Sequence, residues 1–367
     1  MFYCLRCGEK YDDSGVHWRC KCGGPLEYEG PVRPFPADLR GRPWSMWRYK
    51  EAIPVSPEAI VSLGEGMTPI TVLPWEGRRV WLKLDYLCPT GSYKDRGASA
   101  LISKLHEAGA RSIVEDSSGN AGAAIAAYAA RCGMQCEIYV PSGNSPAKLA
   151  QIRAYGARLV EVAGSRQDVA DACRSRVETG GIFYASHNWN PFFIQGIKTI
   201  AYELWEQSAV PDWVVLPAGY GSIALGVYRG FRDLEEWGMV MQRPRIALVQ
   251  AANCAPIYEA FSKGLEEVPA CTVLHTVAEG IACSQPVRGA EVLKAVRESK
   301  GVVIAVEEEE IIRALKGLAH AGIHVEPTSA TVMAGVSKLG ALGKLEPAQK
   351  VVAILSGIGL KSDFWIS

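Results

Sequence analysis

The sequence predicts an α/β fold in which parallel strands are covered by helices on both faces. Apolar strand-like segments alternate with helical segments from about residue 64 to the end of the chain. Several strands are followed by polar, glycine-containing turns with the sequences SSGN, PAGYGS and LSGIG. The chain has 367 residues, of which 48% are hydrophobic, and this is enough for two compact domains with a core each.

Residues 1–30 are expected to form a separate ribbon built around four cysteines. The first pair, Cys4 and Cys7, is followed by one glycine. After a gap of twelve residues comes the second pair, Cys20 and Cys22, which is followed by two glycines. Glycine at these points lets backbone amides turn toward sulfur, and four thiolates form a closed tetrahedral zinc set. So short a segment cannot build a core alone, and a structural metal explains how it folds. The second pair is one residue shorter than C-x-x-C, so a ribbon without metal and a redox site remain as alternatives.

Residues 31–62 are expected to form an extended arm. Six prolines interrupt this stretch, and Trp44, Trp47 and Tyr49 lie between them. The aromatic side chains predict that the arm lies against the main body and is not a free linker.

The remaining chain alternates between the two types of element. The expected strands are residues 78–86, the start of 111–120, 135–142, 157–164, 181–186, the start of 211–222, 243–250, 301–308 and 349–357. The expected helices include residues 121–133, 145–156, 165–180 and 223–231. The acidic run Glu307–Glu310 is expected to open a further helix at residue 308, where negative charge suits the helix dipole. Ligands of parallel sheets bind beyond the carboxyl ends of strands, where the polar turns lie.

The charge balance excludes some classes of partner. Lysine plus arginine equals aspartate plus glutamate at 39 each, so nothing electrostatic favours nucleic acid or an anionic membrane surface. No apolar run approaches the roughly 20 residues of a membrane helix, and the first residues have no apolar signal core. Eleven cysteines without a regular framework suit a reducing compartment. A cytoplasmic protein that handles small molecules is expected.

Two features of the strand-to-helix turns indicate the chemistry. The turn Gly219–Ser222 lies between a strand and a helix, so its backbone amides form an anion cradle, and it lacks the lysine of a nucleotide P-loop. Lys94 lies in the turn PTGSYKDRG, residues 89–97, at the start of a helix. Lysine is the usual covalent partner of an aldehyde. A framed lysine together with a phosphate site suggests pyridoxal phosphate, although Lys94 alone could be a solvated residue at a helix start.

The motifs resemble those of threonine synthases and their relatives among the fold-type II pyridoxal-phosphate enzymes. PTGSYKDRG is similar to the PTGSFKDRG of that family. The other similar motifs, in order, are LGEGMTPI (63–70), SSGN with the helix after it, NPFFIQGIKTIAYELWEQ (190–207), PAGYGS, VEPTSA (325–330) and LSGIGLK (355–361). Their order and spacing agree over roughly residues 60–367, and N-terminal cysteine ribbons also occur in the family.

The resemblance implies the domain organisation. It implies two doubly wound lobes of the tryptophan synthase β-like type, with the cofactor between them. The expected parts are the ribbon 1–30, the arm 31–62, a large lobe of 63–95 and 201–367, and a small lobe of 96–200.

The resemblance also implies roles for individual residues. Lys94 is expected to bind the cofactor aldehyde, Asn120 to hydrogen-bond the 3-hydroxyl of its ring, and Ser356 to face its pyridine nitrogen. The residues expected to bind the cofactor phosphate are Gly219, Tyr220, Gly221 and Ser222. Those expected to hold the substrate carboxylate are Ser117, Ser118 and Gly119. The metal ligands are Cys4, Cys7, Cys20 and Cys22.

Ser356 indicates the type of reaction. A neutral hydroxyl does not hold a proton on the ring nitrogen as an aspartate does, so elimination or replacement is favoured over transamination. Lys94, once substrate displaces it, is the natural acid and base at Cα. Asp95 and Arg96 are expected to pair with each other or to cap local structure.

Several positions depart from the family pattern. Threonine synthases usually carry hydroxyl residues directly after SSGN, where this chain has Ala121 and Gly122, and an arginine where it has Phe193. In the family these groups bind the phosphate of O-phosphohomoserine. Tyr220 replaces a common asparagine, and Cys88 replaces another before PTG, where packing near the cofactor is expected.

The function predicted is that of a lyase of the threonine-synthase type, which eliminates or replaces a leaving group on an amino acid. The best named activity converts O-phosphohomoserine to threonine and phosphate. One alternative is a serine/threonine dehydratase or β-replacement enzyme with an unphosphorylated or differently activated substrate. Another is a non-catalytic pyridoxal-phosphate-binding protein, against which the set Lys94, Asn120 and Ser356 argues. Family relatives are often dimers, so a homodimer is expected.

Overall fold

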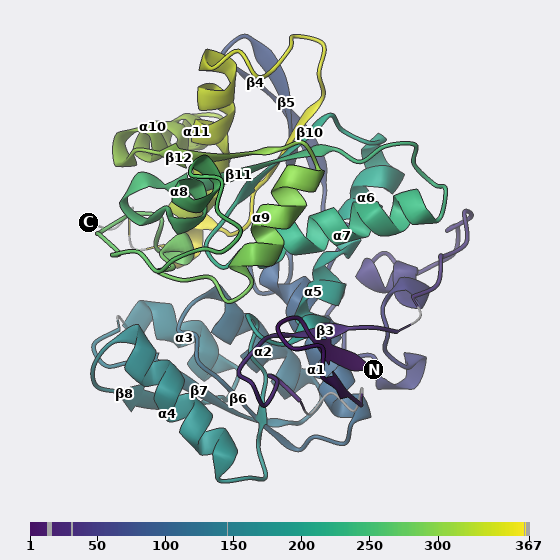
Figure 1. The fold of residues 1–367 in the computed structure, drawn as a ribbon, viewed down its shortest axis with the longest axis vertical. Helices are drawn as coiled ribbons and strands as arrows, with labels where there is room; N and C mark the ends of the chain where they lie inside the picture. The colour runs from purple at the N-terminus through teal and green to yellow at the C-terminus, as the bar shows by residue number, and fades with distance from the viewer. Residues whose placement is uncertain (13–16, 31, 145, 363, 365–367) are drawn as a thin grey trace. The chain divides into compact units, whose positions relative to one another are not determined.

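The computed structural model describes residues 1–12, 17–30, 32–144, 146–362 and 364. The chain divides into two compact units (Figure 1). The first unit combines Met1–Gly66 with Cys88–Ile197, and the second combines Met67–Leu87 with Lys198–Ser367. The first unit contains a three-stranded and a four-stranded sheet, and the second contains a six-stranded sheet. The lobe boundaries expected from the sequence stay a prediction.

The cysteine ribbon is a three-stranded antiparallel sheet in the first unit, drawn in purple in Figure 1. Its strand order is β2-β1-β3, with β1 at Phe2–Cys4, β2 at Lys10–Tyr11 and β3 at Leu26–Tyr28. Residues 13–16 of the expected ribbon lie outside the described residues. Strands of two or three residues bury almost nothing by themselves, so the ribbon depends on its cysteines and on what it packs against.

The arm is not extended throughout. It contains two short 3-10 helices, η1 at Met46–Ala52 and η2 at Pro57–Ala59, and residue 31 lies outside the described range. Trp47 and Tyr49 are buried as expected, and Nε1 of Trp47 donates to Ser99 Oγ at 2.9 Å. Trp44 is an exception, because its side chain is 70% exposed. The arm therefore contacts helix α1 (Lys94–Glu107) through Trp47.

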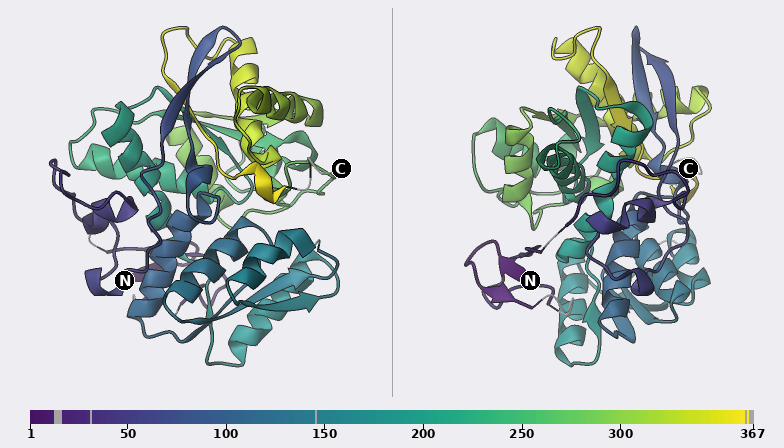
Figure 2. Two further views of the ribbon diagram at one scale, coloured as in Figure 1. Left: turned by 180° about the vertical axis from the view of Figure 1, so that it is seen from behind. Right: turned by 90° about the vertical axis from the view of Figure 1, so that its right-hand side faces the viewer.

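The sheet of the first unit has four parallel strands in the order β8-β7-β6-β9. The strands are β6 (Ser112–Glu115), β7 (Gln135–Pro141), β8 (Arg158–Val162) and β9 (Phe183–Tyr184). The helices are α1 (Lys94–Glu107), α2 (Asn120–Arg131), α3 (Pro146–Ala154), α4 (Arg166–Glu178) and α5 (Pro191–Ile197). Helix α4 lies on the face of the sheet seen in Figure 1, and α2 and α3 lie on the face seen from behind in Figure 2.

Helices α1 and α5 cross at backbone contact, because glycine occupies both helices at the crossing. A Cβ on Gly97 of α1 would lie 2.4 Å from the ring of Phe193. A Cβ on Gly196 of α5 would lie 2.0 Å from the carbonyl oxygen of Arg96. No real Cβ contact is that short, so this close approach requires glycine at both positions. The crossing places Phe193 against the first turn of α1.

The sheet of the second unit has six strands in the order β12-β11-β10-β13-β5-β4. The strands are β4 (Ile70–Trp75), β5 (Arg78–Lys83), β10 (Trp213–Pro217), β11 (Arg245–Ala251), β12 (Val302–Val306) and β13 (Val351–Ile354). All neighbours are parallel except the edge pair β4 and β5. All five residues of β10 are buried, as expected for a central strand covered on both faces.

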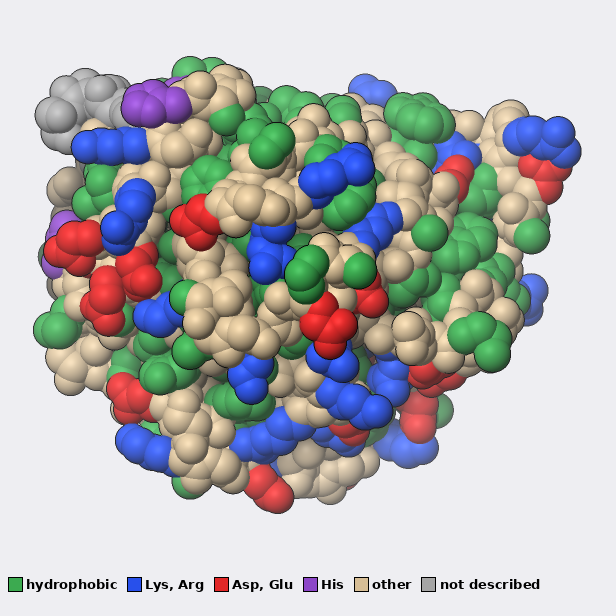
Figure 3. All heavy atoms as spheres, turned by 90° about the horizontal axis from the view of Figure 1, so that it is seen from above, with side chains coloured by type: hydrophobic (Ala, Val, Ile, Leu, Met, Phe, Trp, Pro, Cys, Tyr) green, Lys and Arg blue, Asp and Glu red, His purple; other side chains and the backbone are tan. Residues whose placement is uncertain are grey.

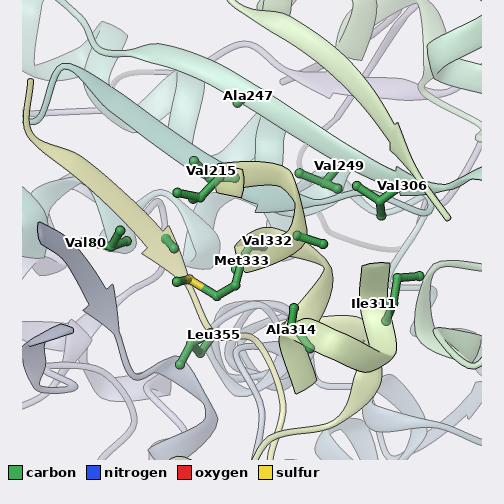
Figure 4. Packing of buried hydrophobic residues seen from close by; sticks show 14 of the residues in the cluster. Val80, Val215, Ala247, Val249, Val306, Ile311, Ala314, Val332, Met333 and Leu355 are labelled. Atoms are coloured by element: carbon green, nitrogen blue, oxygen red, sulfur yellow. The ribbon is translucent and has the colours of Figure 1, made fainter. Parts of the chain in front are cut away.

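Helices cover this sheet and enclose its core. They are α6 (Thr199–Ser208), α7 (Ser222–Glu236), α8 (Pro256–Ser262), α9 (Gly289–Glu298), α10 (Glu308–His320) and α11 (Pro327–Ala341). Figure 4 shows Met333 of α11 and Ile311 of α10 packing with valines of the sheet. A Cβ on Gly335 would lie 2.4 Å from Cγ2 of Val249, so glycine lets α11 approach β11 closely.

The sequence predictions of single elements can be compared with this structure. The predicted α/β class with helices on both faces of parallel sheets is confirmed. The acidic run opens α10 at Glu308, and Glu307 and Glu310 form a capping box. Strand β4 was missed, and the strand expected at 181–186 is reduced to two residues. Residue 145, expected to begin a helix, lies outside the described residues.

A fully buried ion pair ties two distant segments of the second unit together. Nζ of Lys83 lies 2.6 Å from Oε2 of Glu203, and neither side chain is exposed. Nζ of Lys83 also donates to the carbonyl oxygen of Thr68, and Oε1 of Glu203 accepts from the amide of Met67 at 2.8 Å. Met67 has a φ of 48°, so the ion pair holds a strained backbone turn in place.

The face displayed in Figure 3 carries both basic and acidic side chains. They are interspersed over this face, as the balanced composition predicts. Within the described part of the chain, no helix has the length and apolar character needed to cross a bilayer.

Candidate active site

Lys94 lies in the first turn of α1 between two aromatic rings. Its Nζ is 4.9 Å from the ring centroid of Tyr93 and 5.5 Å from that of Phe193, and the side chain is partly buried. Aromatic faces attract a cation and exclude water from one side of it. The amine is therefore held in a defined environment and is not a freely solvated lysine.

The turn before Lys94 is held by Asp95. The carboxylate of Asp95 accepts hydrogen bonds from the amide of Thr90 at 2.7 Å and from its hydroxyl at 2.5 Å. The amide of Gly91 donates to the carbonyl oxygen of Cys88 at 2.7 Å, which closes the PTG turn. The expectation that Asp95 caps local structure is confirmed. Cys88 is buried, as expected for a packing residue.

The SSGN turn leads into α2 at Asn120. Gly119 is the residue before the helix and supplies no side-chain cap, so the first amides of α2 face the turn. A Cβ on Gly122 would lie 1.9 Å from the carbonyl oxygen of Ser117, so the turn folds over this glycine. Close backbone approach thus explains why Gly122 carries no hydroxyl side chain. Ser117 and Ser118 are partly buried and Gly119 is exposed.

Phe193 fills the position where the family pattern has an arginine. Its side chain is fully buried, and its ring lies against Gly97 and faces Lys94. An apolar ring cannot form the charge-assisted pair that a guanidinium makes with a phosphate. The structure therefore gives Phe193 a packing role at the first turn of α1.

Glu115 and His187 form a buried pair that the sequence predictions missed. Nδ1 of His187 lies 2.5 Å from Oε1 of Glu115, at the carboxyl end of β6. Burial raises the pKa of Glu115 well above its ordinary value, and the charge of Asp116 acts in the same direction. Burial lowers the pKa of His187 well below its ordinary value, and the charges of Lys94 and Arg166 add to this. Both shifts favour the uncharged forms of the two side chains.

Nothing in the local sequence around either residue marks this pair. Glu115 stands two residues before SSGN, but His187 lies 72 positions further along the chain. The two meet because β6 and β9 are neighbouring parallel strands. Glu115 is the last residue of β6 and His187 follows the end of β9, so both lie at the same edge of the sheet. The position of each at a strand end was the available signal.

Glu115→Gln is expected to raise stability at neutral and alkaline pH. The protonated carboxyl of Glu115 makes its full contribution to stability below the pKa that it has in the unfolded chain. Because the pKa is higher in the folded protein, this contribution is lost as the pH rises toward the folded pKa. A glutamine needs no proton and keeps a hydrogen bond to His187. The advantage of the variant should therefore grow between about pH 5 and 8, by up to about 1.4 kcal/mol per pH unit. Urea denaturation at three pH values measures this, with the exposed Glu161→Gln as control. A flat difference across this range would contradict the neutral pair.

The glycine turn of the second unit has the form of a phosphate cradle. It follows β10 and leads directly into α7, whose residue before the helix is Gly221 with a φ of 82°. A Cβ on Gly221 would lie 2.4 Å from Val292, and one on Gly219 would lie 2.9 Å from the Cα of Ile281. Both positions thus require glycine: Gly221 because of its left-handed conformation, and Gly219 because its backbone closely approaches Ile281. The first turn of α7 has the sequence Ser-Ile-Ala-Leu and carries no acidic residue that would repel an anion.

Ser356 follows β13 and is held by a second motif. Its hydroxyl lies 3.1 Å from the hydroxyl of Ser329, which belongs to VEPTSA in α11. The Ser329 hydroxyl also accepts from the amide of Gly357 at 2.7 Å. Ser356 is buried. Two motifs separated in sequence therefore orient one neutral hydroxyl at the carboxyl end of a central strand.

The four predicted metal ligands meet in the ribbon. The sulfur atoms of Cys4, Cys7, Cys20 and Cys22 all lie within 4.8 Å of one another. Two of these pairs, Cys4 with Cys22 and Cys7 with Cys20, are 3.5 Å apart. Sulfurs about 2.3 Å from a tetrahedral zinc lie roughly 3.8 Å from each other, so the set has the right size.

The glycines and hydrogen bonds around these sulfurs support the same interpretation. Gly8 and Gly23 both have a left-handed φ, and the amide of Arg6 donates to Sγ of Cys4 at 3.4 Å. The hydroxyl of Tyr11, 3.1 Å from Sγ of Cys20, lowers the pKa of that thiol to about 6. A thiolate is the form that binds a metal. The expected turning of backbone amides toward sulfur is confirmed.

The fold and the lysine turn define the class of the protein. The family described as "Pyridoxal-phosphate dependent enzyme" matches residues 61–357, and the chain belongs to it. Curated relatives identify the type of enzyme more closely. A threonine synthase of Methanocaldococcus jannaschii is 36% identical over 373 residues, covering 98% of this chain and 92% of the relative. A threonine synthase of Methanosarcina acetivorans is 33% identical over 371 residues, covering 98% and 91%. The chain is a pyridoxal-phosphate-dependent lyase of the threonine-synthase type.

Solved structures agree with the fold. An aspartate racemase structure has a TM-score of 0.68 at 26% identity and covers 79% of this chain and 89% of its own. A threonine deaminase from Solanum lycopersicum has a TM-score of 0.71 and covers 89% and 92%. At 21% identity the latter similarity concerns the fold alone. The fold-type II assignment predicted from the sequence is confirmed.

Proposed function

We propose that this enzyme converts O-phosphohomoserine to threonine and phosphate. The observation that carries the proposal is the position of Lys94, held between two rings in a PTGSYKDRG turn, within a chain similar to threonine synthases over 98% of its length. The substrate is inferred from the resemblance to threonine synthases, and the roles described below are argued from the residues of the chain.

The residues present fit pyridoxal phosphate. Gly219 and Gly221 pack their backbone closely against Ile281 and Val292, so the turn holds a fixed shape directly before the N-terminus of a 15-residue helix. Such a turn accepts a phosphate through its backbone amides. The roles proposed for the cofactor site are those of Lys94 for the aldehyde, Asn120 for the 3-hydroxyl, Ser356 for the pyridine nitrogen, and Gly219, Tyr220, Gly221 and Ser222 for the phosphate.

The chain's own groups would divide the catalytic work. Pyridoxal phosphate, when bound, withdraws electrons from the bonds to Cα of the substrate. The amine of Lys94 takes the proton from Cα and returns protons to the substrate. The amides and hydroxyls of Ser117, Ser118 and Gly119 hold the substrate carboxylate at the start of α2. The neutral hydroxyl of Ser356 does not favour a proton on the ring nitrogen, which suits elimination and replacement.

Two groups that bind the substrate phosphate in the family are absent here. Phe193 stands in place of an arginine, and Ala121 stands in place of a hydroxyl residue. An arginine in a dry site contributes several kcal/mol of binding to a phosphate. We therefore expect O-phosphohomoserine to bind more weakly here than in an enzyme with the arginine. The same observation favours an unphosphorylated or differently activated amino acid as the second candidate substrate.

A spectral titration separates these substrates. The visible absorbance of the bound cofactor is followed while O-phosphohomoserine, O-phosphoserine, serine and threonine are added in turn. Phosphate release and threonine formation from O-phosphohomoserine would establish the proposed function. Ammonia and a keto acid from serine or threonine, with no phosphate release from either phosphoester, would assign a dehydratase instead.

We also propose that the ribbon holds one structural zinc ion on Cys4, Cys7, Cys20 and Cys22. The size of the cysteine cluster supports this. All four positions of a tetrahedron are occupied by protein, so the metal would be structural and not catalytic.

The purified chain is expected to hold about one zinc ion, because four thiolates close the coordination shell. Cys20→Ser should reduce the zinc content to a small fraction of that value. Elemental analysis measures both, and Cys132→Ser, at a cysteine that follows α2 and is not part of the cluster, serves as control. Free thiols together with no metal in the unmodified chain would remove the zinc site.

The partner expected for the site is a small amino acid, and we propose that the chain forms a homodimer. The basis for the dimer is the resemblance to a family whose members are often dimeric. Analytical ultracentrifugation of the cofactor-loaded protein tests it, and a concentration-independent mass of 39.7 kDa would exclude it.

A further inference from the structure

The segment from Tyr184 to Phe193, called the 184–193 segment below, connects β9 to α5 and reaches the catalytic lysine. Its last residue, Phe193, faces Nζ of Lys94 at 5.5 Å. His187 packs edge-on against Phe193, with ring centroids 5.8 Å apart, and pairs with Glu115. The segment therefore determines what lies beside the amine.

The cysteine ribbon contacts one end of this segment through Trp18. The indole of Trp18 meets Tyr184 at a centroid distance of 4.9 Å and Trp189 at 5.5 Å, both edge-on. Trp18 stands two residues before Cys20, one of the four clustered cysteines. Trp18 and Trp189 both pack against a core cluster of the small sheet that includes Val114 and Tyr184. This contact joins the second cysteine pair to the start of the segment.

The ribbon contacts the other end through Phe2 and Tyr28. The ring of Phe192 lies 5.6 Å from that of Phe2 and 5.4 Å from that of Tyr28. Phe2 and Tyr28 face each other as partners of neighbouring strands, and Phe2 stands two residues before Cys4. Phe192 is adjacent to Phe193, whose ring lies beside Lys94. The ribbon therefore contacts a residue directly next to Phe193 in the chain.

The interior of the segment contains buried polar atoms that lack hydrogen-bond partners. Among the described residues, Oγ of Ser186, Oδ1 of Asn188 and Nδ2 of Asn190 are buried without a hydrogen-bond partner. Buried polar atoms without partners destabilise the conformation that contains them. Packing must therefore offset this cost, and the ring contacts of the ribbon lie at both ends of the segment.

We propose that Phe2, Trp18 and Tyr28 are positioning residues, through which the folded cysteine ribbon holds the 184–193 segment beside Lys94. The ribbon then acts on substrate binding without touching substrate. This inference rests on the proposed function only for the choice of substrate in one of its measurements. It assigns the ribbon a place in the active enzyme that goes beyond a local metal staple.

The test uses the full-length, cofactor-loaded protein. Trp18→Ala and Phe2→Ala remove one contact each, and Trp18→Phe keeps an aromatic ring at the first position. Lys10→Ala is the matched control, since Lys10 belongs to the ribbon and its ammonium group forms an exposed pair with Glu29. Hydrogen–deuterium exchange is followed for peptides covering residues 184–193, together with cofactor absorbance, zinc content and the kinetics with O-phosphohomoserine.

Both alanine variants are expected to exchange residues 184–193 at least about fivefold faster while cofactor absorbance is retained. The KM should rise about tenfold with kcat changed less than about threefold, because the segment shapes substrate binding. Trp18→Phe should restore most of the protection, and Lys10→Ala should match the unmodified chain. Unchanged exchange in both alanine variants would overturn the inference, and so would equal loss in Trp18→Phe. If exchange responds as expected but O-phosphohomoserine is not turned over by any form, the proposed function fails and the inference stands.

Discussion

Lys94→Ala is expected to abolish catalysis, with a rate at least ~10³-fold below that of the unmodified enzyme. The amine of Lys94 is the group that binds the cofactor aldehyde and exchanges protons with Cα in the proposed function. Alanine supplies neither a nucleophile nor a base. The variant should also lose the visible absorbance of the bound cofactor after dialysis. Steady-state kinetics and absorption spectra measure the two effects.

Lys294→Ala provides the control for this variant. Lys294 lies on α9 with a side chain that is 75% exposed, and it forms only an exposed pair with Glu298. It should retain full colour and activity. A Lys94→Ala protein that keeps both its colour and its turnover would contradict the role proposed for Lys94, and with it the proposed mechanism.

Glu203→Ala is expected to destabilise the fold by about 3–5 kcal/mol. The substitution leaves the ammonium group of Lys83 completely buried, with carbonyl and amide oxygens from Thr68 and Gln207 as its remaining partners. It also removes the acceptor for the amide of Met67 in a strained turn. Removing one partner of a buried ion pair lowers the stability more than replacing both partners, because it leaves a buried charge without its counter-charge. Urea denaturation followed by circular dichroism measures the change.

Two comparisons make this prediction specific. The double variant with Lys83→Met and Glu203→Leu removes both charges and should lose less stability than Glu203→Ala alone. Glu236→Ala removes only an exposed pair with Arg232 and should change stability by less than about 0.5 kcal/mol. A Glu203→Ala protein as stable as Glu236→Ala would show that Lys83 does not carry a buried charge.

Much of the fold followed from local patterns. The five-residue run WVVLP is apolar throughout, and it forms the central strand β10. The acidic residues before Ile311 start α10 at the residue expected. Strand β4 escaped prediction, because the segment Ile70–Trp75 is largely exposed at the edge of the sheet and has a proline inside it.

The candidate site was predictable where short motifs carry it. Lys94, the SSGN turn, Gly219–Ser222 and Ser356 stand in motifs whose spacing can be read directly. Glu115 and His187 were missed, since their contact joins residues 72 positions apart and depends on β6 lying beside β9. The role of Phe193 also needed the structure, because its closeness to Lys94 depends on two glycines at a helix crossing.

The sequence by itself determined the class of fold, the lysine turn, the glycine turn at residues 219–222 and the spacing of four cysteines. These features are local, because each depends on residues within one turn or on the periodicity of one element. Only the tertiary structure decided that the carboxyl group of Glu115 and the imidazole of His187 form one buried pair. It also decided that the rings of the ribbon pack against both ends of the 184–193 segment. The reason is physical: burial and long-range packing set the pKa of a group and the partners of a ring, and neither is encoded in a short stretch of chain.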